Sequence, residues 1–407
     1  MLHALAHRDL SSGLPGDVSV LVVDPVPLDD TAARHRTWSF WADGTPSVAP
    51  AVSASWRHVT VRDHRYDLML DLDPLRYHLI RSTDFAGFTE DQVARAPHVH
   101  VTRVEAAVTA VADRGATASV AWDGGEADAA LVLDSRPSAP VRAPSVWWWQ
   151  HFRGWLLPPG AVTETIAGFM DFRTPQPRAG LSFGYLLPLP DGRALAEYTE
   201  FSPDRLDDAG YDAAIRNYLD LLGVADDVLP EHVETGAIPM TDAPFTRRPS
   251  ARVLRIGTAG GATRGSTGYT FSAMLRDGHA VASWVAAGGP VTDTPIDIEP
   301  QYPPRHRWFD AVQLQALADG WVSGPDFFTG LFRRQPASRV LRFLDGATGR
   351  FEELAILGAA PTLPMTRAAF ASSGARIRSG IRGLLGRPHD PDHVVPAAPV
   401  PGRGVAP

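Results

Sequence analysis

The chain of 407 residues contains no cysteine and no lysine, so all 38 of its lysine-or-arginine positions are arginine. The absence of cysteine excludes disulfides, thiolate zinc sites and cysteine nucleophiles. The absence of lysine excludes Schiff-base chemistry and the lysine of a phosphate-binding P-loop. Any catalysis must therefore use carboxylates, histidines, tyrosines or a cofactor.

Long apolar runs, positive charge and metal motifs are also missing. No apolar run reaches the roughly 18 residues that a membrane-spanning helix needs. The formal net charge of −8 argues against a broad nucleic-acid footprint. The 14 histidines show no spacing typical of a metal site. We therefore expect neither a nucleic-acid partner nor a bound metal.

Three short apolar segments, at 18–23, 129–133 and 252–256, are typical of parallel strands that are covered on both faces. The first segment ends on Asp24, where an acid commonly holds the ribose of a dinucleotide. The second ends on Asp134, a further signal of the same type. These segments predict a cofactor domain that is assembled from separated parts of the chain.

The third strand runs into the glycine-rich stretch IGTAGGATRGSTGYTF at 256–271. Its glycines would let the backbone approach a ligand, and a helix beginning around 267–269 would suit an anionic group. The alternative is a tight strand–helix connection without a ligand, but the two acids favour cofactor binding. The predicted cofactor contacts are Asp24, Asp134, Gly257, Gly260, Gly261, Thr267, Gly268 and Tyr269.

The fold class that these patterns predict is α/β combined with α+β. We expect a Rossmann-like cofactor domain and an inserted antiparallel-sheet substrate domain, followed by a mostly helical part and a disordered tail. The expected bounds, in that order, are 1–145 with 246–290, then 146–245, 291–370 and 371–407. Within the first domain we expect a helix beginning near Pro74 and antiparallel strands over 98–111 and 117–125.

One carboxylate of the inserted domain is a candidate general acid. In the strand at 194–202, Glu197 shares a face with Leu195, Thr199 and Phe201. Burial of a carboxyl among apolar neighbours raises its pKa, and a neutral carboxyl can donate a proton. The alternative is that this face is exposed and Glu197 is only solvated.

Aromatic side chains are concentrated around 147–155 and 38–41. They could line an apolar tunnel or simply form core. Asp171 stands among apolar residues, and a structural salt bridge to Arg173 on the same strand face is the favoured interpretation. The predicted tunnel residues are Trp38, Phe40, Trp149, Phe152, Trp155, Asp171, Tyr185 and Tyr198.

Seven motifs along residues 18–370 together resemble the soluble, flavin-dependent lycopene β-cyclases of bacteria. They are TWSFW (37–41), VLDSRP (132–137), QHFRGW (150–155), FMDFR (169–173), YLLPLPDGRALAEYTEFS (185–202), IPMTD (238–242) and IGTAGGATRGSTGYTF (256–271). The resemblance implies a fold similar to aromatic hydroxylases, a reduced FAD, and NAD(P)H as reductant. It also implies a non-redox isomerisation of lycopene ψ-ends to β-rings, giving γ- or β-carotene.

The family's essential glutamate motif corresponds here to Leu195-Ala196-Glu197-Tyr198-Thr199. The resemblance therefore assigns Glu197 as the catalytic acid, with Tyr198 at the family's second acidic position. A polyene substrate implies a cytoplasmic protein with peripheral membrane contact, for which the segment 375–387 is a candidate helix. The alternatives are an FAD-dependent monooxygenase or reductase acting on an isoprenoid or carotenoid, and an inactive shortened cyclase.

Members of this family carry a strand and a Gly-x-Gly-x-x-Gly loop before the helix that corresponds to MLHALAHR. We therefore expect residue 1 to be an internal position of the natural gene product. In a sheet of order 3-2-1-4 the preceding strand is central. The strand at 18–23 should then not pair directly with the strand at 252–256.

Overall fold

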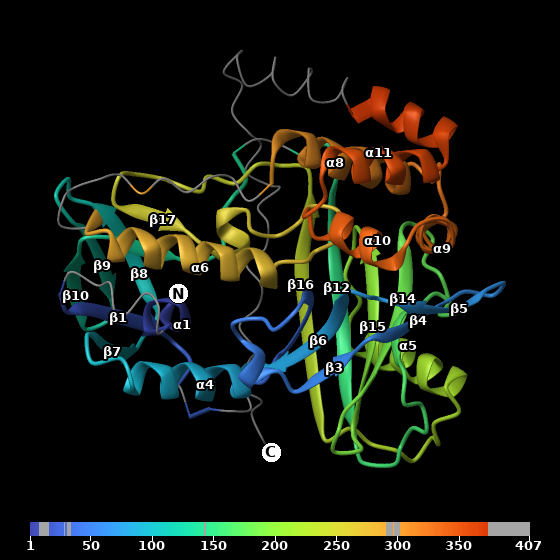
Figure 1. The fold of residues 1–407 in the computed structure, drawn as a ribbon, viewed down its shortest axis with the longest axis horizontal. Coiled ribbons are helices and arrows are strands. Elements are labelled where there is room, and N and C mark those ends of the chain that lie inside the picture. Colours follow the sequence, from blue (N-terminus) through green and yellow to red (C-terminus); the bar gives the residue numbers. More distant parts are fainter. Residues whose placement is uncertain are drawn as a thin grey trace.

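The computed structural model describes residues 1–7, 16–27, 29–30, 34–141, 144–289, 296 and 302–372. The predicted tail helix at 375–387, and nearly all of the predicted disordered tail, lie outside these residues. In Figure 1 the segments with parallel strands occupy one side of the molecule, and a large sheet with a group of C-terminal helices occupies the other.

Two pairs of parallel strands form the cofactor-type part of the fold. β1 (Val18–Asp24) pairs with β7 (Val99–Glu105), and β11 (Val132–Asp134) pairs with β17 (Val253–Arg255). As the sequence predicts, β1 and β17 do not pair with each other in the described part of the chain. The predicted antiparallel pairing is wrong for the first half of 98–111, because β7 pairs in parallel with β1. β7 is half exposed, and exposure produces the alternating polarity that antiparallel strands usually show.

Three helices and a small meander surround these strands. α1 (Leu2–Ala6) packs against α4 (Ser82–Ala94) and α6 (Phe271–Ala286), between which it lies in Figure 1. The helix after the glycine-rich loop therefore begins at 271, slightly later than the predicted 267–269. The meander is antiparallel and consists of β8 (Val108–Asp113), β9 (Ala118–Trp122) and β10 (Gly125–Ala129).

The large sheet has seven strands, all antiparallel to their neighbours except for one parallel pair, β13 with β4. In spatial order they are β16 (His232–Thr241), β12 (Trp147–Leu157), β15 (Ala194–Ser202), β14 (Leu181–Pro188), β13 (Ala167–Asp171), β4 (His58–Arg62) and β5 (Asp67–Asp71). The predicted domain bounds of 146–245 are therefore too narrow, because 58–71 supplies two strands. These strands pair the edge of β13, whose backbone groups would otherwise lack partners.

A smaller three-stranded sheet joins the two parts and consists of β2 (Thr37–Asp43), β6 (Leu75–Arg81) and β3 (Ala54–Trp56). The helix predicted near Pro74 does not form, because the segment after Pro74 is β6. The residues from Tyr77 to Ile80 are all buried, so β6 is covered on both faces. A continuous apolar run of this kind has no period that separates strand from helix.

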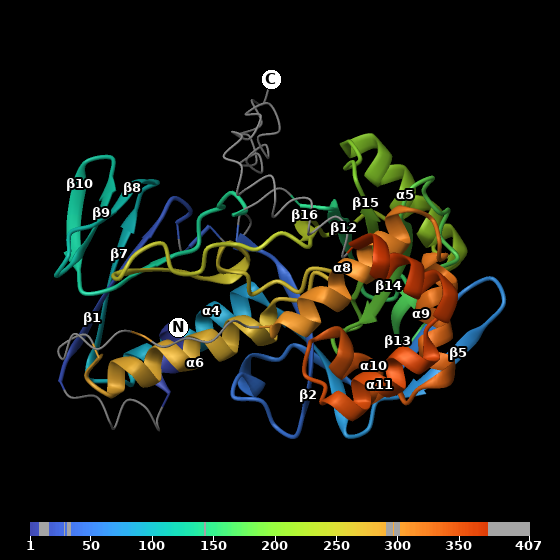
Figure 2. The same cartoon turned by 90° about the horizontal axis from the view of Figure 1, so that it is seen from above.

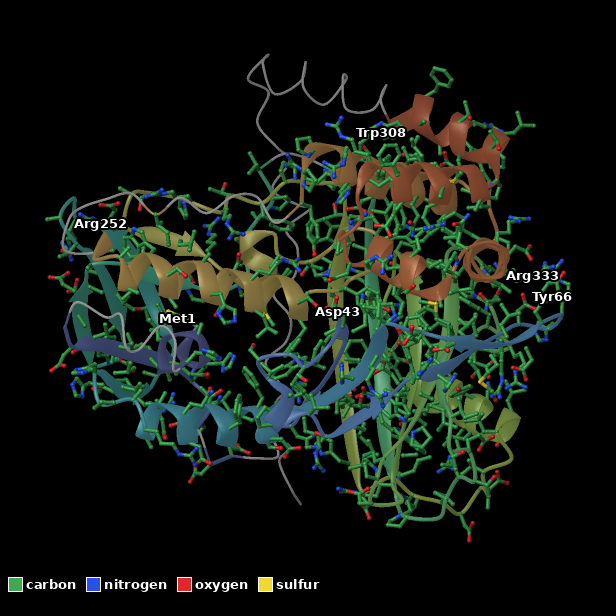
Figure 3. The ribbon with its side chains drawn as sticks, in the orientation of Figure 1. Met1, Asp43, Tyr66, Arg252, Trp308 and Arg333 are labelled. Atoms are coloured by element: carbon green, nitrogen blue, oxygen red, sulfur yellow. The ribbon has the colours of Figure 1, made fainter. Side chains whose placement is uncertain are left out.

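Helices cover both faces of the large sheet, as Figure 2 shows from above. α5 (Asp208–Leu221) packs on one face, and the C-terminal helices cover the other. These are α8 (Pro304–Ala318), α9 (Gly324–Arg334), α10 (Ala337–Leu344) and α11 (Arg350–Ala359), so the predicted helical part is observed. At the sheet edge, Arg333 of α9 lies 3.8 Å from the ring centre of Tyr66 (Figure 3).

None of the described helices is, by itself, long and apolar enough to cross a membrane. Two consecutive helices, α11 and Thr362–Ser372, pass that test together by length and composition only. The chain bends by 116° between them.

Candidate active site

Glu197 lies in the middle of β15, on the sheet face that the C-terminal helices cover. Leu195 and Phe201, which alternate with it on the same face, belong to the hydrophobic core shared with α8 to α11. The predicted alternation of this strand is therefore confirmed. The tertiary structure places a carboxyl in the apolar interior between the sheet and the helices.

A row of paired residues crosses four strands at the level of Glu197. Glu197 pairs with Tyr185 of β14 on one side and with Gly154 of β12 on the other. Gly154 pairs in turn with Glu234 of β16. Directly opposite residues of neighbouring strands project to the same face, so two carboxylates and a tyrosine lie in one row on this face.

Gly154 provides the space between the two carboxylates. A methyl group at this position would lie 3.0 Å from Cγ and 3.2 Å from Oε1 of Glu234. The side chain of Glu234 therefore extends over Gly154 toward Glu197. No other residue type leaves this space open.

Burial raises the pKa of Glu197 to about 8, and the negative charge of Glu234 adds to the rise. The hydroxyl of Thr199 opposes it by donating a hydrogen bond of 2.7 Å to Oε1 of Glu197. The Glu197 side chain keeps some accessible surface although it lies deep in the molecule. At neutral pH this carboxyl holds its proton and can donate it.

Glu234 is a site residue that the sequence did not single out. It is 3% exposed. Its Oε2 accepts a 2.9 Å hydrogen bond from the backbone N–H of Thr37, and its Oε1 accepts one from the Thr37 hydroxyl. Burial raises the pKa of Glu234, whereas the two hydrogen bonds from Thr37 lower it. No sequence motif marks this carboxylate, because its place depends on the pairing of β12 with β16.

Several aromatic side chains lie near Glu197. Burial is the main cause of the raised pKa of Tyr77, Tyr185 and Tyr269, and the charge of Glu197 contributes to each. The ring of Trp41 meets that of Tyr269 edge-on, with 4.5 Å between centroids. The Tyr269 hydroxyl forms no hydrogen bond of normal geometry, although Tyr185 influences its pKa.

Two of the predicted tunnel residues, Phe152 and Tyr185, lie on the Glu197 face of the sheet. Phe152 pairs with Thr199 and packs against Gly236. Three others, Trp149, Trp155 and Tyr198, alternate onto the opposite face, and the predicted tunnel role is wrong for them. Trp155 and Tyr198 pack under α5 in a separate hydrophobic cluster.

Asp171 also lies outside the Glu197 site. Its carboxylate receives hydrogen bonds of 2.8 Å from Nε and 2.5 Å from Nη2 of Arg173. Asp171 pairs with Gly184, which packs against Tyr218 of α5. The favoured salt bridge is therefore confirmed, and the inclusion of Asp171 among tunnel residues is corrected.

Trp38 and Phe40 belong to a third cluster, with Phe271 of α6, and do not line the Glu197 space. They alternate with Thr37 and Trp41 along β2, so the site side of this strand presents Thr37 and Trp41 instead. The aromatic motif was recognised correctly, but which of its members face the site depends on how β2 is oriented.

The glycine-rich loop borders a cavity of about 340 Å³. Gly257 and Gly261 have φ values of +60° and +78°, and a side chain at Gly261 would point into open space. Gly260 has a different role, because a Cβ there would collide with the carbonyl of Arg255. The cavity also contacts Arg247, whose Nη2 pairs with Asp277 while its Nε and Nη1 are buried without hydrogen-bond partners. A close backbone, open space and unpaired donors fit an anionic cofactor.

The end of this loop is held by contacts within the chain. The Thr267 hydroxyl donates a 3.1 Å hydrogen bond to the carbonyl of Leu344. Gly268 has a φ of +71° and packs so closely on Gln150 that a Cβ would collide with it. Thr267 and Gly268 therefore position the loop between the glycine turn and the Glu197 face. Neither presents a free polar side chain to the cavity.

The two strand-end acids have partners of their own. Asp24 accepts a 2.9 Å hydrogen bond from the backbone N–H of Val26, and its other oxygen lies 3.2 Å from Nη2 of Arg34. Asp134 receives the guanidinium of Arg136 at 2.9 and 3.0 Å. Both acids stand at the carboxyl ends of parallel strands, as predicted. Their roles toward a ribose remain predictions.

Solved structures with a similar fold are flavin-dependent enzymes or relatives of reductases. One is a geranylgeranyl bacteriochlorophyll reductase-like protein from Thermoplasma acidophilum, with a TM-score of 0.56 and 12% identity over 86% of this chain and 99% of that chain. Another is a p-nitrophenol 4-monooxygenase from Pseudomonas putida, with a TM-score of 0.56 and 15% identity over 88% and 93%. A flavin-dependent brominase gives a TM-score of 0.54 and 15% identity over 85% and 90%.

These similarities show the predicted Rossmann-like flavoprotein fold. No curated protein sequence matches the chain significantly. A family model described as "Lycopene cyclase protein" matches residues 3–370. That match spans most of the 407 residues and contains both the glycine-rich loop and Glu197. The chain therefore belongs to the lycopene cyclase protein family.

Proposed function

We propose that the protein cyclises the ψ-ends of lycopene to β-rings without net redox change, giving γ- or β-carotene. The observation that carries this proposal is Glu197, a carboxyl in an apolar interior whose pKa is raised to about 8. Such a group is protonated at neutral pH and is suited to initiate a carbocation reaction.

The proposed reaction begins when protonated Glu197 donates its proton to the terminal double bond of the substrate. The resulting tertiary cation is attacked by the nearby internal double bond, which closes a six-membered ring. The ring carbon at the new bond then passes its proton to the Glu197 carboxylate, which forms the β-ring and restores the acid, so atoms and charge balance. The apolar surroundings exclude water, which would otherwise trap the cation.

Aromatic side chains would favour the cation during this sequence. The rings of Tyr185, Tyr77 and Trp41 present π-faces or edges near the Glu197 site. Aromatic faces attract cations, and the attraction is strongest where water is excluded. These rings would therefore stabilise the intermediate without reacting with it.

We also propose FAD as the cofactor, in its reduced form, with NAD(P)H as reductant. Gly257 and Gly261 would allow close approach of the backbone, and Arg247 would bind an anionic part of the cofactor. When bound in the reduced form, the flavin would supply electron density that favours a cationic intermediate. The similar monooxygenase and brominase folds support this choice of cofactor.

An apolar surface on the C-terminal helices supports a peripheral contact with a membrane. The exposed residues are Phe351 (90%), Leu354 (65%), Leu363 (84%) and Phe370 (77%). They lie on α11 and on the helix Thr362–Ser372, and an exposed Arg350 is adjacent. An apolar surface of this kind fits a lipid boundary. We propose that the protein takes its hydrocarbon substrate from the membrane and otherwise resides in the cytoplasm.

The test is incubation of purified, flavin-loaded protein with lycopene in vesicles, followed by mass spectrometry. A cyclase product has the mass of its substrate, whereas a monooxygenase product gains oxygen and a reductase product gains hydrogen. Unchanged mass with a shorter conjugated chromophore supports the proposal. A product with added oxygen or hydrogen would support the alternative reaction classes, and unchanged lycopene would contradict the proposal for this chain.

A further inference from the structure

The second carboxylate of the site, Glu234, has no assigned role, and its geometry differs from that of a structural acid. Several other buried acids of this protein are paired with arginine, as Asp171 is with Arg173 and Asp310 is with Arg264. Glu234 is instead held by Thr37 alone, and it extends over Gly154 toward another carboxyl. Two buried acids that share one site cannot both ionise without a large energetic cost.

The register of the sheet makes this approach specific. Glu234, Gly154 and Glu197 occupy the same row on three adjacent strands, and Gly154 lies between the two glutamates. Strands are about 4.8 Å apart, so the row leaves a gap of about two strand spacings between the two backbones. The Glu234 side chain extends into this gap over Gly154, and a methyl group of Leu195 borders the same space.

The surroundings of Glu234 determine which of the two acids keeps the proton. The two hydrogen bonds from Thr37 favour the ionised form of Glu234, and so does the positive charge of Arg36. Glu197 receives only the Thr199 hydroxyl. His35 and His232 border the same small pocket as Glu234; their rings are tilted by 54° with 3.9 Å between centres, and burial lowers the pKa of His35 to about 4. They are neutral at pH 7, so Arg36 and Arg81 supply the positive charge nearby.

We propose that Glu234 is a positioning residue that acts through Glu197: the Thr37-bound Glu234 anion, which extends over Gly154, keeps the proton on Glu197. This inference rests on the proposed function for its chemical meaning. The influence of the Glu234 charge on Glu197 is a property of the pair, and it can be measured without substrate.

The test is infrared titration of purified protein, following the C=O stretch of a protonated buried carboxyl between pH 5 and pH 10. Glu197→Gln identifies the band by removing it. Glu234→Gln should leave the band but move its midpoint to lower pH by on the order of one unit, because the neighbouring negative charge is gone. Glu234→Asp keeps the charge and should restore a midpoint close to that of the unchanged protein.

Glu231→Gln is the matched control, because Glu231 is an exposed acid just before β16 that pairs with Arg193. This control should not move the midpoint. Circular dichroism and thermal unfolding establish that each variant is folded. If Glu234→Gln did not fold, Glu234→Asp and Gly154→Ala would test the pair, since the methyl of Gly154→Ala displaces Glu234 and should lower the midpoint as well.

Cyclisation assays on the same proteins separate this inference from the proposed function. If the midpoint shifts but no variant or parent cyclises lycopene, the carboxyl pair is supported and the proposed function fails. If the parent cyclises lycopene but the Glu234→Gln midpoint is unchanged, the pair is overturned and the function stands. If the parent cyclises lycopene and the Glu234→Gln midpoint shifts, the alkaline limit of activity in Glu234→Gln should move to lower pH together with the infrared midpoint.

Discussion

Both faces of the large sheet bury acidic side chains, but the partners of these acids differ between the two faces. On the α5 face, Asp171 is bound by Arg173, and Glu200 accepts a 2.7 Å hydrogen bond from the Tyr198 hydroxyl. On the opposite face, Glu197 forms no ion pair within the described part of the chain, and its nearest charged neighbour is another carboxylate. The partners on the α5 face favour an ionised carboxylate, whereas burial and the charge of Glu234 favour the protonated form of Glu197.

The difference shows why one strand can contain both kinds of acid. Glu197 and Glu200 lie on the same strand, and alternation places them on opposite faces. The position of a glutamate along the strand therefore decides which sheet face it occupies, and so whether its neighbours are polar or apolar. Of the two sheet faces, the Glu197 face carries the carboxyl whose pKa is raised to about 8 and aromatic rings near it, which is the combination that the proposed reaction uses.

Replacement of the unpaired acid should give the largest effect on activity. We expect Glu197→Gln to lower the rate of lycopene cyclisation by at least about a hundredfold, because the amide cannot donate the initiating proton. The rate is measured with purified protein and lycopene vesicles. Glu200→Gln, a buried acid of the same strand on the other face, is the control and should retain most of the activity per folded molecule. Equal losses in both variants would remove the functional distinction between the faces.

Loss of the arginine on the α5 face should affect stability instead. We expect Arg173→Ala to lower the free energy of unfolding by about 3 kcal/mol, because it leaves the 2% exposed side chain of Asp171 without its partner. Urea unfolding measures this change. The double variant Arg173→Ala with Asp171→Asn should recover part of the loss. A single variant as stable as the parent would show that the ion pair does not matter for this face.

The pH dependence of stability should distinguish the faces further. The folded-state pKa of Glu197, about 8, is above its unfolded value, so the folded protein binds the proton more tightly. Its contribution to stability is therefore fully present below the unfolded pKa and is lost as pH rises toward 8. We expect the melting temperature to fall less between pH 5 and pH 8 in Glu197→Gln than in the parent. Parallel curves for the two proteins would contradict the raised pKa.

Removal of the Tyr269 hydroxyl should have the smallest effect on stability and activity. The hydroxyl is buried without a hydrogen bond of normal geometry, so its removal costs no such bond. Tyr269→Phe should change the free energy of unfolding by less than about 1 kcal/mol and should keep the edge-on contact with Trp41. Chemical denaturation measures the free energy of unfolding, and we expect the variant to retain lycopene cyclisation. A large loss of activity at unchanged stability would instead assign the hydroxyl a direct role.

Several properties could be predicted from the amino-acid sequence because they depend on neighbours along the chain. Alternation in β15 predicted the side chains that flank Glu197, and the spacing of Asp171 and Arg173 predicted their ion pair. The apolar runs predicted the parallel strands, and motif order predicted the family. Local periodicity failed where a strand was buried on both faces, as in β6, which was predicted as a helix.

The remaining features depend on contacts between distant segments. Trp38, Phe40, Trp149, Trp155 and Tyr198 were assigned to the site from their type, but the sheet faces that they occupy are decided by how each strand packs. Glu234 reaches Glu197 only because three strands align Gly154 between them. By itself the sequence determined that Glu197 has apolar neighbours. The tertiary structure decided that a second carboxylate lies across Gly154 from it, because strand register is set by long-range pairing and burial, not by local pattern.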